Sequence, residues 1–194
     1  MHKFDPSHAH TLNNPQRLEH ENPELILTAA GVRQDMFVVE IGSGAGFYTI
    51  PLSKIVGSNG VVYAVDVSER MLDVLKQNII TKQGHDIIKP LLSEETRIPI
   101  PAHIADMIIN VNMLHEVEDK NAFMVELSRV MKKDGRLLII DHKKEQTPSG
   151  PPVRDRISYE EVKSLLEQWF DIVVKGPSGE YQYGLIAMKA KDGK

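Results

Sequence analysis

The most informative absence in this chain of 194 residues is that of cysteine, of which it has none. Without cysteine, a disulfide framework, an iron–sulfur cluster, a zinc ribbon and thiol chemistry are all excluded. An excess of positive charge is missing as well, because 27 acidic side chains against 23 Lys and Arg give a net charge of −4. This balance excludes a broadly basic surface for nucleic acid, although it leaves room for a local basic patch.

Long apolar runs are also absent. No stretch approaches the ~18 consecutive apolar residues that a membrane-spanning helix needs. The first residues, 1–6, lack the apolar core of a signal peptide. We therefore expect a cytoplasmic protein with neither a membrane nor a nucleic acid as its partner. The eight histidines are scattered along the chain, so they predict no metal site.

What the sequence does contain is an ordinary globular composition, with 41% hydrophobic residues. Its length favours one domain over residues 1–194. Residues 1–22 begin with a polar stretch that has no period, and we interpret them as an N-terminal arm. Residues 143–157 include a segment rich in Pro, Ser and Gly, which predicts a surface loop rather than a linker between domains.

Apolar and amphipathic segments alternate through most of the chain. Apolar positions at helical spacing, bounded by caps or glycines, predict helices, and the short apolar runs between them predict strands. The predicted helices are 23–30, 47–56, 69–79 and 119–131, and the predicted strands are 36–41, 61–66, 87–92, 104–111 and 136–141. Because these strands are apolar on both faces, they indicate a parallel sheet that helices cover on both sides.

The C-terminal part follows a different pattern. Ser158 and Glu161 form a capping-box pattern that predicts one further helix. Two strands then follow each other directly, at about 170–175 and 182–190, joined by Gly-Pro-Ser-Gly at 176–179. This spacing predicts an antiparallel hairpin at the edge of the sheet. The predicted fold class is therefore α/β: a Rossmann-like, doubly wound, mostly parallel sheet with a C-terminal antiparallel hairpin.

Three glycines, Gly42, Gly44 and Gly46, stand between the first predicted strand and the next helix. Glycine tolerates positive φ and lets a ligand approach the backbone closely. The start of a helix adds free N–H groups and partial positive charge. A turn of this kind indicates a cradle for a nucleoside-bearing ligand. The alternative is a glycine-rich connection that only packs the helix against the strand.

Two acids stand near this glycine turn. Asp66 ends the second predicted strand, 20 residues after Gly46, where an acid can accept both hydroxyls of a ribose. Glu40 lies inside an otherwise apolar strand, where a carboxylate without a partner is costly. For each acid the alternative is a solvent-facing side chain on a short strand or at a strand end.

These residues resemble the class I S-adenosylmethionine-dependent methyltransferases, in their small-molecule branch. The resemblance rests on Glu40-Ile41-Gly42-Ser43-Gly44-Ala45-Gly46, on Asp66 and on the later segment from Ile98-Pro99 to Ala105-Asp106. It implies a seven-stranded sheet with its last strand antiparallel. It also implies that S-adenosylmethionine is the cofactor and that a small molecule accepts the methyl group.

The resemblance also implies a role for each matching position. Glu40 and the glycine turn would hold the methionine part of the cofactor, Asp66 would bind the ribose, and Val67 and Met71 would lie against the adenine. The full set of implied cofactor-binding residues is Glu40, Gly42, Ser43, Gly44, Gly46, Asp66, Val67, Met71, Glu94, Glu95 and Asn110.

One of these positions departs from the family pattern. The family usually has an Asp near the end of the third strand, which takes the adenine amino group. Here Glu94 stands at that position and Glu95 follows it. A pair of solvent-facing acids on a loop is the alternative.

A general base is needed only where the nucleophile must lose a proton. Residues 110–115 follow the fourth predicted strand, and by resemblance they line the junction between cofactor and acceptor. His115 is the candidate catalytic residue there, because an imidazole titrates near physiological pH. The alternative is a histidine that hydrogen-bonds the local loop.

A basic cluster follows the fifth predicted strand. His142, Lys143 and Lys144 come directly after it, with Arg154 and Arg156 further on. Ligands of parallel sheets bind outside the carboxyl ends of the strands, so these side chains could face an anionic or polar acceptor. The alternative is an exposed basic loop.

Two other functions were weighed against methyl transfer. A nicotinamide-dependent oxidoreductase needs G-x-G-x-x-G, and its third glycine would fall on Phe47. A non-catalytic module that keeps the S-adenosylmethionine pocket without turnover is the second alternative. Methylation of DNA or RNA is disfavoured, because Asn110-Val111-Asn112-Met113 stands where those enzymes carry N-P-P-Y or N-P-P-F.

Overall fold

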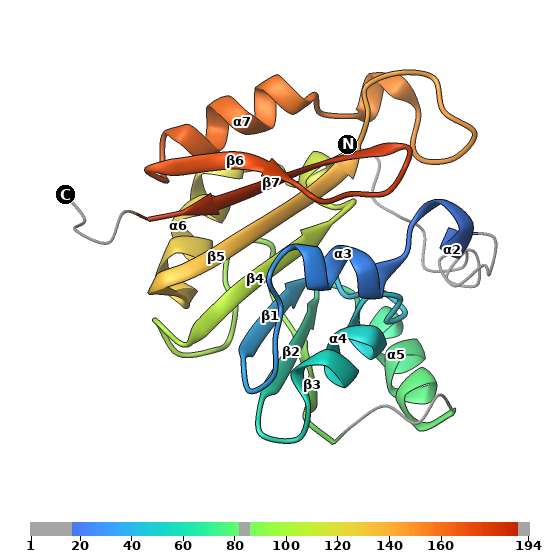
Figure 1. The fold of residues 1–194 in the computed structure, drawn as a ribbon, viewed down its shortest axis with the longest axis vertical. Helices are drawn as coiled ribbons and strands as arrows, with labels where there is room; N and C mark the ends of the chain where they lie inside the picture. The colour runs from blue at the N-terminus through green and yellow to red at the C-terminus, as the bar shows by residue number, and fades with distance from the viewer. Residues whose placement is uncertain (1–16, 82–85, 190–194) are drawn as a thin grey trace.

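One mixed sheet organises the computed structural model, which describes residues 17–81 and 86–189. Its seven strands lie in the order β3-β2-β1-β4-β5-β7-β6 (Figure 1). The strands β1 to β5 pair in parallel, whereas β7 pairs antiparallel with both β5 and β6. The strands are β1 (Phe37–Ile41), β2 (Val61–Asp66), β3 (Ile88–Leu92), β4 (Ala105–Val111), β5 (Met131–His142), β6 (Ile172–Gly176) and β7 (Gln182–Met188). The predicted sheet and its antiparallel hairpin are confirmed.

Helices cover both faces of the sheet, as the doubly wound prediction requires. The helices α3, α4 and α5 lie over one face, and α6 and α7 lie over the other (Figure 1). The helices are α2 (Arg17–His20), α3 (Pro23–Ala29), α4 (Thr49–Val56), α5 (Glu69–Thr81), α6 (Lys120–Val130) and α7 (Tyr159–Glu167), and the short 3₁₀ helices are η2 (Leu114–Glu116) and η3 (Val153–Asp155).

Two hydrophobic cores follow from this arrangement, one on each face of the sheet. Successive strand residues point to opposite faces, so Val38 and Met107 join the core under α3, α4 and α5. Their neighbours Val39 and Ile108 join the core under α6 and α7. All four side chains are fully buried, which explains why the strands are apolar on both faces.

The predicted helix starts are confirmed at two ends. The Asn22 side chain accepts a hydrogen bond from Leu25 N at the start of α3, and Pro23 occupies the first turn. At α7, Ser158 and Glu161 form a reciprocal capping box. Each cap satisfies backbone N–H groups that have no partner within the helix.

Most boundaries lie within one or two residues of the prediction, and two of the differences have a structural reason or are large. The helix α4 begins at Thr49 rather than at Phe47. The strand β5 begins at Met131, five residues before the predicted strand 136–141, and continues through Gly135. A register shift between β4 and β5 lies beside this glycine. A Cβ at Gly135 would lie 2.8 Å from the Ala105 carbonyl oxygen, so glycine is needed for this close strand contact.

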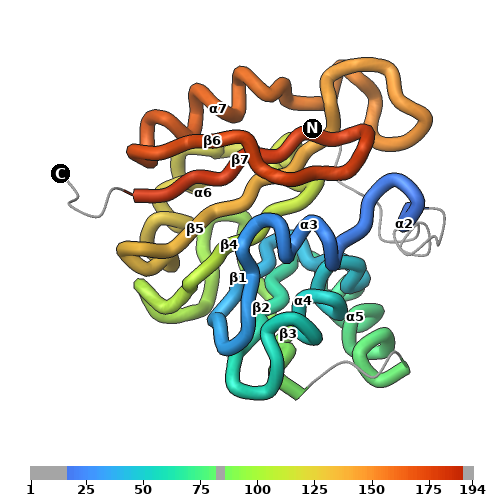
Figure 2. Tube along the Cα trace, viewed as in Figure 1, coloured from blue at the N-terminus to red at the C-terminus, as the bar shows by residue number. Residues whose placement is uncertain are grey.

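Segments from both ends of the chain meet at the carboxyl end of the parallel strands. Figure 2 shows α2, the loop after β5 and the turn between β6 and β7 on this side of the sheet. Residues 1–16 of the predicted arm lie outside the described residues, and the next four form α2. The predicted surface loop at 143–157 contains η3. None of the helices in the described ranges has the length and apolar character of a membrane span.

Candidate active site

A cavity of about 1140 Å³ opens at the carboxyl ends of β1, β2, β4 and β5. Its walls also include Arg17, Glu19 and His20 of α2, Glu21 directly after it, and residues 148–152 and 180–182 from the two loops that gather there. Cavities that hold a single small ligand usually enclose roughly 300–1,000 Å³. The space is therefore sufficient for a cofactor and a second small molecule side by side.

The glycine turn forms one wall of this cavity. Gly42, Gly44 and Gly46 have φ values of 77°, 51° and 90°, in the left-handed region that favours glycine. Residues 42–45 line the cavity, whereas Gly46 does not. A Cβ on Gly46 would lie 2.5 Å from Leu75 Cδ1, so this glycine allows α5 to pack against the turn. Gly42 and Gly44 are therefore placed to border a ligand, whereas Gly46 serves the packing of α5 against the turn.

Asp66 braces the same turn from the end of β2. Its Oδ2 accepts a hydrogen bond from Gly44 N at 2.9 Å, and its Oδ1 accepts one from Ser68 N at 2.9 Å. Burial raises the pKa of Asp66, and the backbone hydrogen bonds oppose this rise. Each carboxylate oxygen has a second lone pair, and the side chain lines the cavity, so Asp66 can also accept hydrogen bonds from a ligand.

Glu40 is buried beneath the turn with one side-chain partner. The Thr49 hydroxyl donates to Glu40 Oε2. Burial raises the pKa of Glu40 to about 8, the Thr49 hydrogen bond lowers it, and the nearby Asp66 raises it further. A carboxyl group in this state favours a cationic ligand, because a positive charge beside it restores the ionised form. Thr49 was not identified from the sequence.

The remaining predicted cofactor residues lie at the same end of the sheet. Val67 is exposed and Met71 is buried against Ala45, and both line the cavity. Glu94 and Glu95 line it as well. Glu95 also has a local role, because its Oε1 accepts hydrogen bonds from the backbone N–H groups of the two residues that precede α6, at 2.8 and 3.4 Å.

Asn110 lies outside the cavity lining. It is fully buried, and its Nδ2 donates to the Ile41 carbonyl oxygen at 3.2 Å, so it ties β4 to β1. Its Oδ1 has no hydrogen-bond partner within the described residues, and the same is true of the buried Ser43 hydroxyl. Buried polar atoms without partners are uncommon and mark places where a ligand or water completes the structure.

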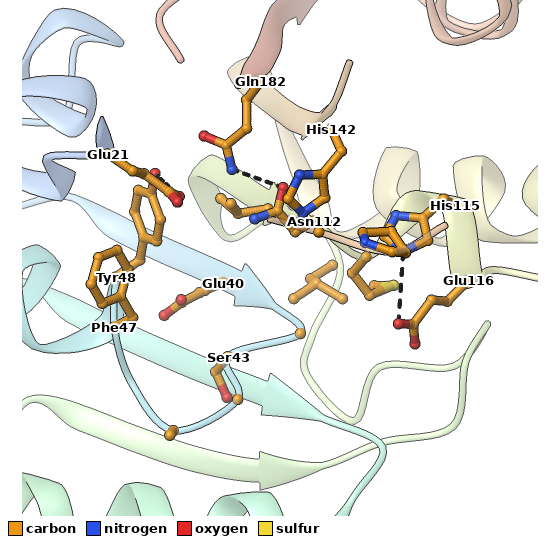
Figure 3. Close-up of a pocket in the computed structure, with 18 of the residues that line it drawn as sticks. Glu21, Glu40, Ser43, Phe47, Tyr48, Asn112, His115, Glu116, His142 and Gln182 are labelled. Atoms are coloured by element: carbon orange, nitrogen blue, oxygen red, sulfur yellow. Dashed lines mark hydrogen bonds and ion pairs between the residues drawn. The ribbon is translucent and has the colours of Figure 1, made fainter. Parts of the chain in front are cut away.

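His115 and Asp141 form a buried pair at the ends of β4 and β5. The His115 Nδ1 and Asp141 Oδ1 atoms are 2.8 Å apart, and His115 N donates to Asp141 Oδ2 at 3.2 Å. Burial lowers the pKa of His115, but hydrogen bonding and charge from Asp141, with a further effect of Glu116, raise it above its ordinary value. The ring lines the cavity (Figure 3). Asp141 was not identified from the sequence.

A second imidazole, that of His142, lies beside this pair, but its pKa is shifted in the opposite direction. The rings of His142 and His115 lie 6.4 Å apart between centroids. Burial lowers the pKa of His142 to about 4, although Asp141 opposes this, so its ring stays neutral. The loop that covers it approaches closely, because a Cβ on Gly150 would lie 2.7 Å from His142 Nδ1.

The rest of the basic cluster is a structural feature of the loop. Lys143 Nζ donates to the Glu180 carbonyl oxygen, and Lys144 pairs with a carboxylate of α7. Arg156 is buried and donates to four backbone carbonyls of the loop and to the Thr147 hydroxyl. Neither these three side chains nor Arg154 lines the cavity, so apart from His142 the cluster does not face the acceptor side; Lys144 and Arg154 are exposed, whereas Arg156 is buried within the loop.

Comparison with known proteins identifies the family. A family model described as a methyltransferase domain matches residues 39–139, just over half of the chain. The chain belongs to this methyltransferase family. The match overturns the nicotinamide-dependent alternative, and the family implies S-adenosylmethionine as the cofactor.

Named relatives agree with this assignment. A ubiquinone/menaquinone biosynthesis C-methyltransferase of Marinomonas sp. (strain MWYL1) is 29% identical over 133 residues, which cover 69% of this chain and 53% of that protein. The corresponding protein of Pectobacterium carotovorum subsp. carotovorum (strain PC1) is 28% identical over 157 residues, covering 81% and 61%. The chain thus spans little more than half the length of these curated relatives.

A solved structure is similar along nearly the whole chain. The crystal structure of a SAM-dependent methyltransferase from Aquifex aeolicus has a TM-score of 0.90 and 38% sequence identity. The similarity covers 97% of this chain and all of that one. The sheet order and the C-terminal hairpin are therefore those of a methyltransferase fold.

The residues present fit S-adenosylmethionine. The glycine turn leaves the backbone open at Gly44, the buried Glu40 carboxyl is suited to an ammonium group, and the Asp66 carboxylate is suited to hydroxyl donors. The unpartnered Ser43 hydroxyl adds a further polar group beside the turn. These groups lie on the side of the cavity formed by β1 and β2.

Proposed function

We propose that this chain transfers the methyl group of S-adenosylmethionine to a small-molecule acceptor, and that His115 acts as the general base. One observation carries the proposal: the His115–Asp141 pair lines the same cavity as the glycine turn. The C-methyltransferase names of the curated relatives support a small-molecule acceptor.

The side of the cavity formed by β1 and β2 would bind the cofactor. Glu40 and residues 42–45 would hold the methionine part, and Asp66 would accept hydrogen bonds from the ribose. Val67 and Met71 would border the adenine. When bound, the cofactor supplies an electrophilic methyl group with a good leaving group, so the protein mainly positions the two reactants.

Asp141 prepares His115 for proton transfer. With Asp141 ionised, His115 Nδ1–H donates to the carboxylate, which leaves the lone pair on Nε2 in the neutral ring. The same carboxylate accepts hydrogen bonds from the backbone N–H groups of His115 and His142, so its own orientation is fixed. Nε2 can then take the proton of an acceptor whose nucleophilic group must be deprotonated.

The raised pKa of His115 sets the direction of the pH dependence. The base is active only when neutral, and Asp141 and Glu116 favour its charged form. The rate of methyl transfer should therefore rise with pH through a pKa above the ordinary histidine value of about 6.5. His142 stays neutral over this range and adds no second step.

The variant His115→Gln tests the role of the base. A positioned general base contributes roughly 10²–10⁴-fold, so kcat should fall by that factor while calorimetry shows an unchanged Kd for S-adenosylhomocysteine. The assay follows tritium from S-adenosylmethionine into a panel of phenols and catechols. The matched control is His20→Gln, because His20 also lines the cavity but pairs with the exposed Glu180.

The same assay separates an enzyme from a binding module. Tight S-adenosylmethionine binding without turnover of any panel member would favour the non-catalytic module. An equal kcat in His115→Gln and wild type would instead leave methyl transfer standing and remove His115 from its role. Loss of cofactor binding in wild type would reject the proposed function as a whole.

A further inference from the structure

Two side-chain amides form a hydrogen-bonded relay in the wall of the cavity, on the side opposite the glycine turn. Gly179 N–H donates to Gln182 Oε1 at 3.1 Å, and Gln182 Nε2 donates to Asn112 Oδ1 at 2.8 Å (Figure 3). A backbone N–H can only donate, so it fixes which end of the Gln182 amide is the oxygen. Gln182 in turn fixes the oxygen of Asn112. The relay therefore ends in Asn112 Nδ2, which carries two N–H donors.

The free end of this relay faces the cavity. Asn112 lines the cavity, and within the described residues its Nδ2 has no hydrogen-bond partner. Asn112 is half-buried, so protein atoms do not enclose its amide on all sides. Asn112 has a φ of 54°, a left-handed conformation that asparagine tolerates better than most residues. The backbone thus adopts an uncommon conformation at the residue that presents a donor to the cavity.

The relay is held from behind by the N-terminal segment. Gln182 is buried, with Gly179 N and Asn112 Oδ1 as its side-chain hydrogen-bond partners, and its amide contributes to lowering the pKa of the Glu21 carboxyl. Burial raises the pKa of Glu21, but hydrogen bonds from Arg17, Tyr48 and Gln182 lower it overall, so Glu21 is ionised. The oxygen and the nitrogen of the Gln182 amide therefore both have hydrogen-bond partners, and a 180° flip of the amide would break both hydrogen bonds.

The surrounding walls indicate what kind of molecule would meet this donor. The apolar and aromatic residues of the lining are Phe47, Tyr48, Met113, Tyr181, Pro148, Pro151 and Pro152, and the acids Glu19, Glu21, Glu116 and Glu180 line the cavity as well. Arg17 is the only Lys or Arg side chain that the described part of the chain adds to the lining, and it is bound to Glu21. Glu116 adds negative charge beside His115. The excess of acids over Arg17 disfavours an anion, and the aromatic and proline side chains suit contact with an aromatic ring.

We propose that Asn112 binds the acceptor through its oxygen, that Gln182 positions Asn112 for this contact, and that the acceptor is a neutral hydroxyarene. Asn112 Nδ2–H donates to a lone pair of the acceptor hydroxyl, which leaves the hydroxyl proton free to face His115. This inference rests on the proposed function, because it names the class of acceptor and one residue that selects it.

A matched pair of probes tests the recognition of the oxygen. 2-Naphthol and 2-methylnaphthalene have nearly the same shape, and only the first carries a hydroxyl. Both are titrated into the full chain saturated with S-adenosylhomocysteine. Since one hydrogen bond contributes roughly 0.5–1.5 kcal/mol, wild type should bind 2-naphthol about 3- to 10-fold more tightly. The anion 2-naphthoate should bind more weakly than 2-naphthol.

Two variants of Asn112 show whether this residue creates the preference. Asn112→Gly keeps the positive φ without a side chain, and Asn112→Ala keeps the Cβ but removes the amide. Neither variant has a side chain that can donate to or accept from the hydroxyl, so both should bind the two neutral probes equally. The control Asn22→Gly makes the same change at the α3 cap, where glycine is tolerated, and it should keep the preference.

The variant Gln182→Met tests the positioning role. It leaves Asn112 in place but removes the donor that fixes its amide, so the preference for 2-naphthol should be lost. A role in stability alone would lower the Tm without changing the ratio of the two Kd values. In wild type, the Asn112 side-chain amide resonances should shift with 2-naphthol and stay in place with 2-methylnaphthalene.

The outcomes distinguish this inference from the proposed function. If S-adenosylhomocysteine does not bind, the proposed function fails. If it binds but wild type shows no preference for 2-naphthol, or the Asn112 variants retain that preference, only the present inference is overturned. Tighter binding of 2-naphthoate than of 2-naphthol would overturn the assignment of a neutral acceptor.

Discussion

The two sides of the cavity are built in different ways. The side assigned to the cofactor, here called the cofactor half, comes from residues 40–45, 66–68 and 93–95, at the ends of three neighbouring strands, and from Met71 of α5. The other side, the acceptor half, draws Glu21, Asn112 and Gln182 together from distant parts of the sequence, next to the His115–Asp141 pair. The first half depends on local turns, and the second depends on the fold of the whole chain.

The electrostatics of the two halves differ as well. In the cofactor half, burial raises the pKa of Glu40 and of Asp66, which prepares both acids for positive or hydrogen-donating partners. In the acceptor half, the pKa values of two neighbouring imidazoles shift in opposite directions. Asp141 raises the pKa of His115, whereas burial lowers that of His142. Environments that separate the pKa values of similar groups are typical of sites with distinct acid–base roles.

The largest expected effect is the loss of cofactor binding in Gly44→Val. Gly44 has positive φ and lines the cavity, so a branched side chain there would be strained and would occupy the space of the cofactor. Calorimetry should detect no binding of S-adenosylmethionine. In wild type, cofactor at 100 times its Kd should stabilise the fold by about 2.7 kcal/mol, and the variant should show no such shift in thermal melting.

The matched control is Gly57→Val. Gly57 also has positive φ, but a Cβ there would meet nothing within 4 Å, and the residue is remote from the cavity lining. This variant should lose stability through backbone strain of roughly 1–2 kcal/mol and keep the wild-type Kd. A full cofactor shift in Gly44→Val would mean that the cofactor does not lie over this turn.

A smaller effect separates the two predicted acids of the cofactor half. Asp66→Ala should weaken the cofactor more than Glu94→Ala, because Asp66 would accept two charge-assisted hydrogen bonds, each worth roughly 1.5–3 kcal/mol. Asp66 also braces Gly44 N, so part of its effect acts through the turn. Calorimetric Kd values for both variants decide the order. Wild-type Kd values in both would reject both assignments.

Most residues that the sequence assigned to the cofactor line one side of the cavity, and their sequence signals are local. The glycine turn, Glu40 and Asp66 stand at fixed offsets from strand ends, and the alternation of apolar segments predicted the sheet. Asn110 was assigned to the cofactor from its place after the fourth strand, yet it lies outside the cavity lining. Its side chain turns toward β1, and no spacing rule reports that direction.

The acceptor half could be predicted only in part. His115 was identified from its position, but Asp141 looked like one more residue of an apolar strand. The Gln182–Asn112 contact joins residues 70 positions apart. It exists because β7 inserts between β5 and β6, and that order follows from tertiary packing rather than from local pattern. Contacts of this kind carry no signal in a single sequence.

A further prediction concerns protons rather than affinity. With its pKa raised to about 8, Glu40 is mostly protonated at pH 7, and an ammonium group beside it lowers that pKa. Cofactor binding at pH 7 should therefore release close to one proton. Titrations in buffers of different ionisation enthalpy measure this number, and Glu40→Gln should reduce it to near zero. Proton uptake on binding would contradict the sign.

The smallest expected effect is that of a substitution at Lys144, in the loop between β5 and α7. Lys144 pairs with Glu161 at the surface, at 3.0 Å, and does not line the cavity. Exposed ion pairs contribute roughly 0–1 kcal/mol, so Lys144→Ala should change the Tm by only a few degrees. Its kcat and acceptor KM should match wild type. A marked rise in the acceptor KM would show that the basic cluster contributes to acceptor binding after all.

A crystal structure of the chain with S-adenosylhomocysteine tests the division of the cavity most directly. The account predicts density over residues 42–45, with the ribose hydroxyls on Asp66, and an open space bordered by Asn112 Nδ2 and the His115 ring. Density for the cofactor against Asn112 and Gln182, with the glycine turn uncovered, would contradict it.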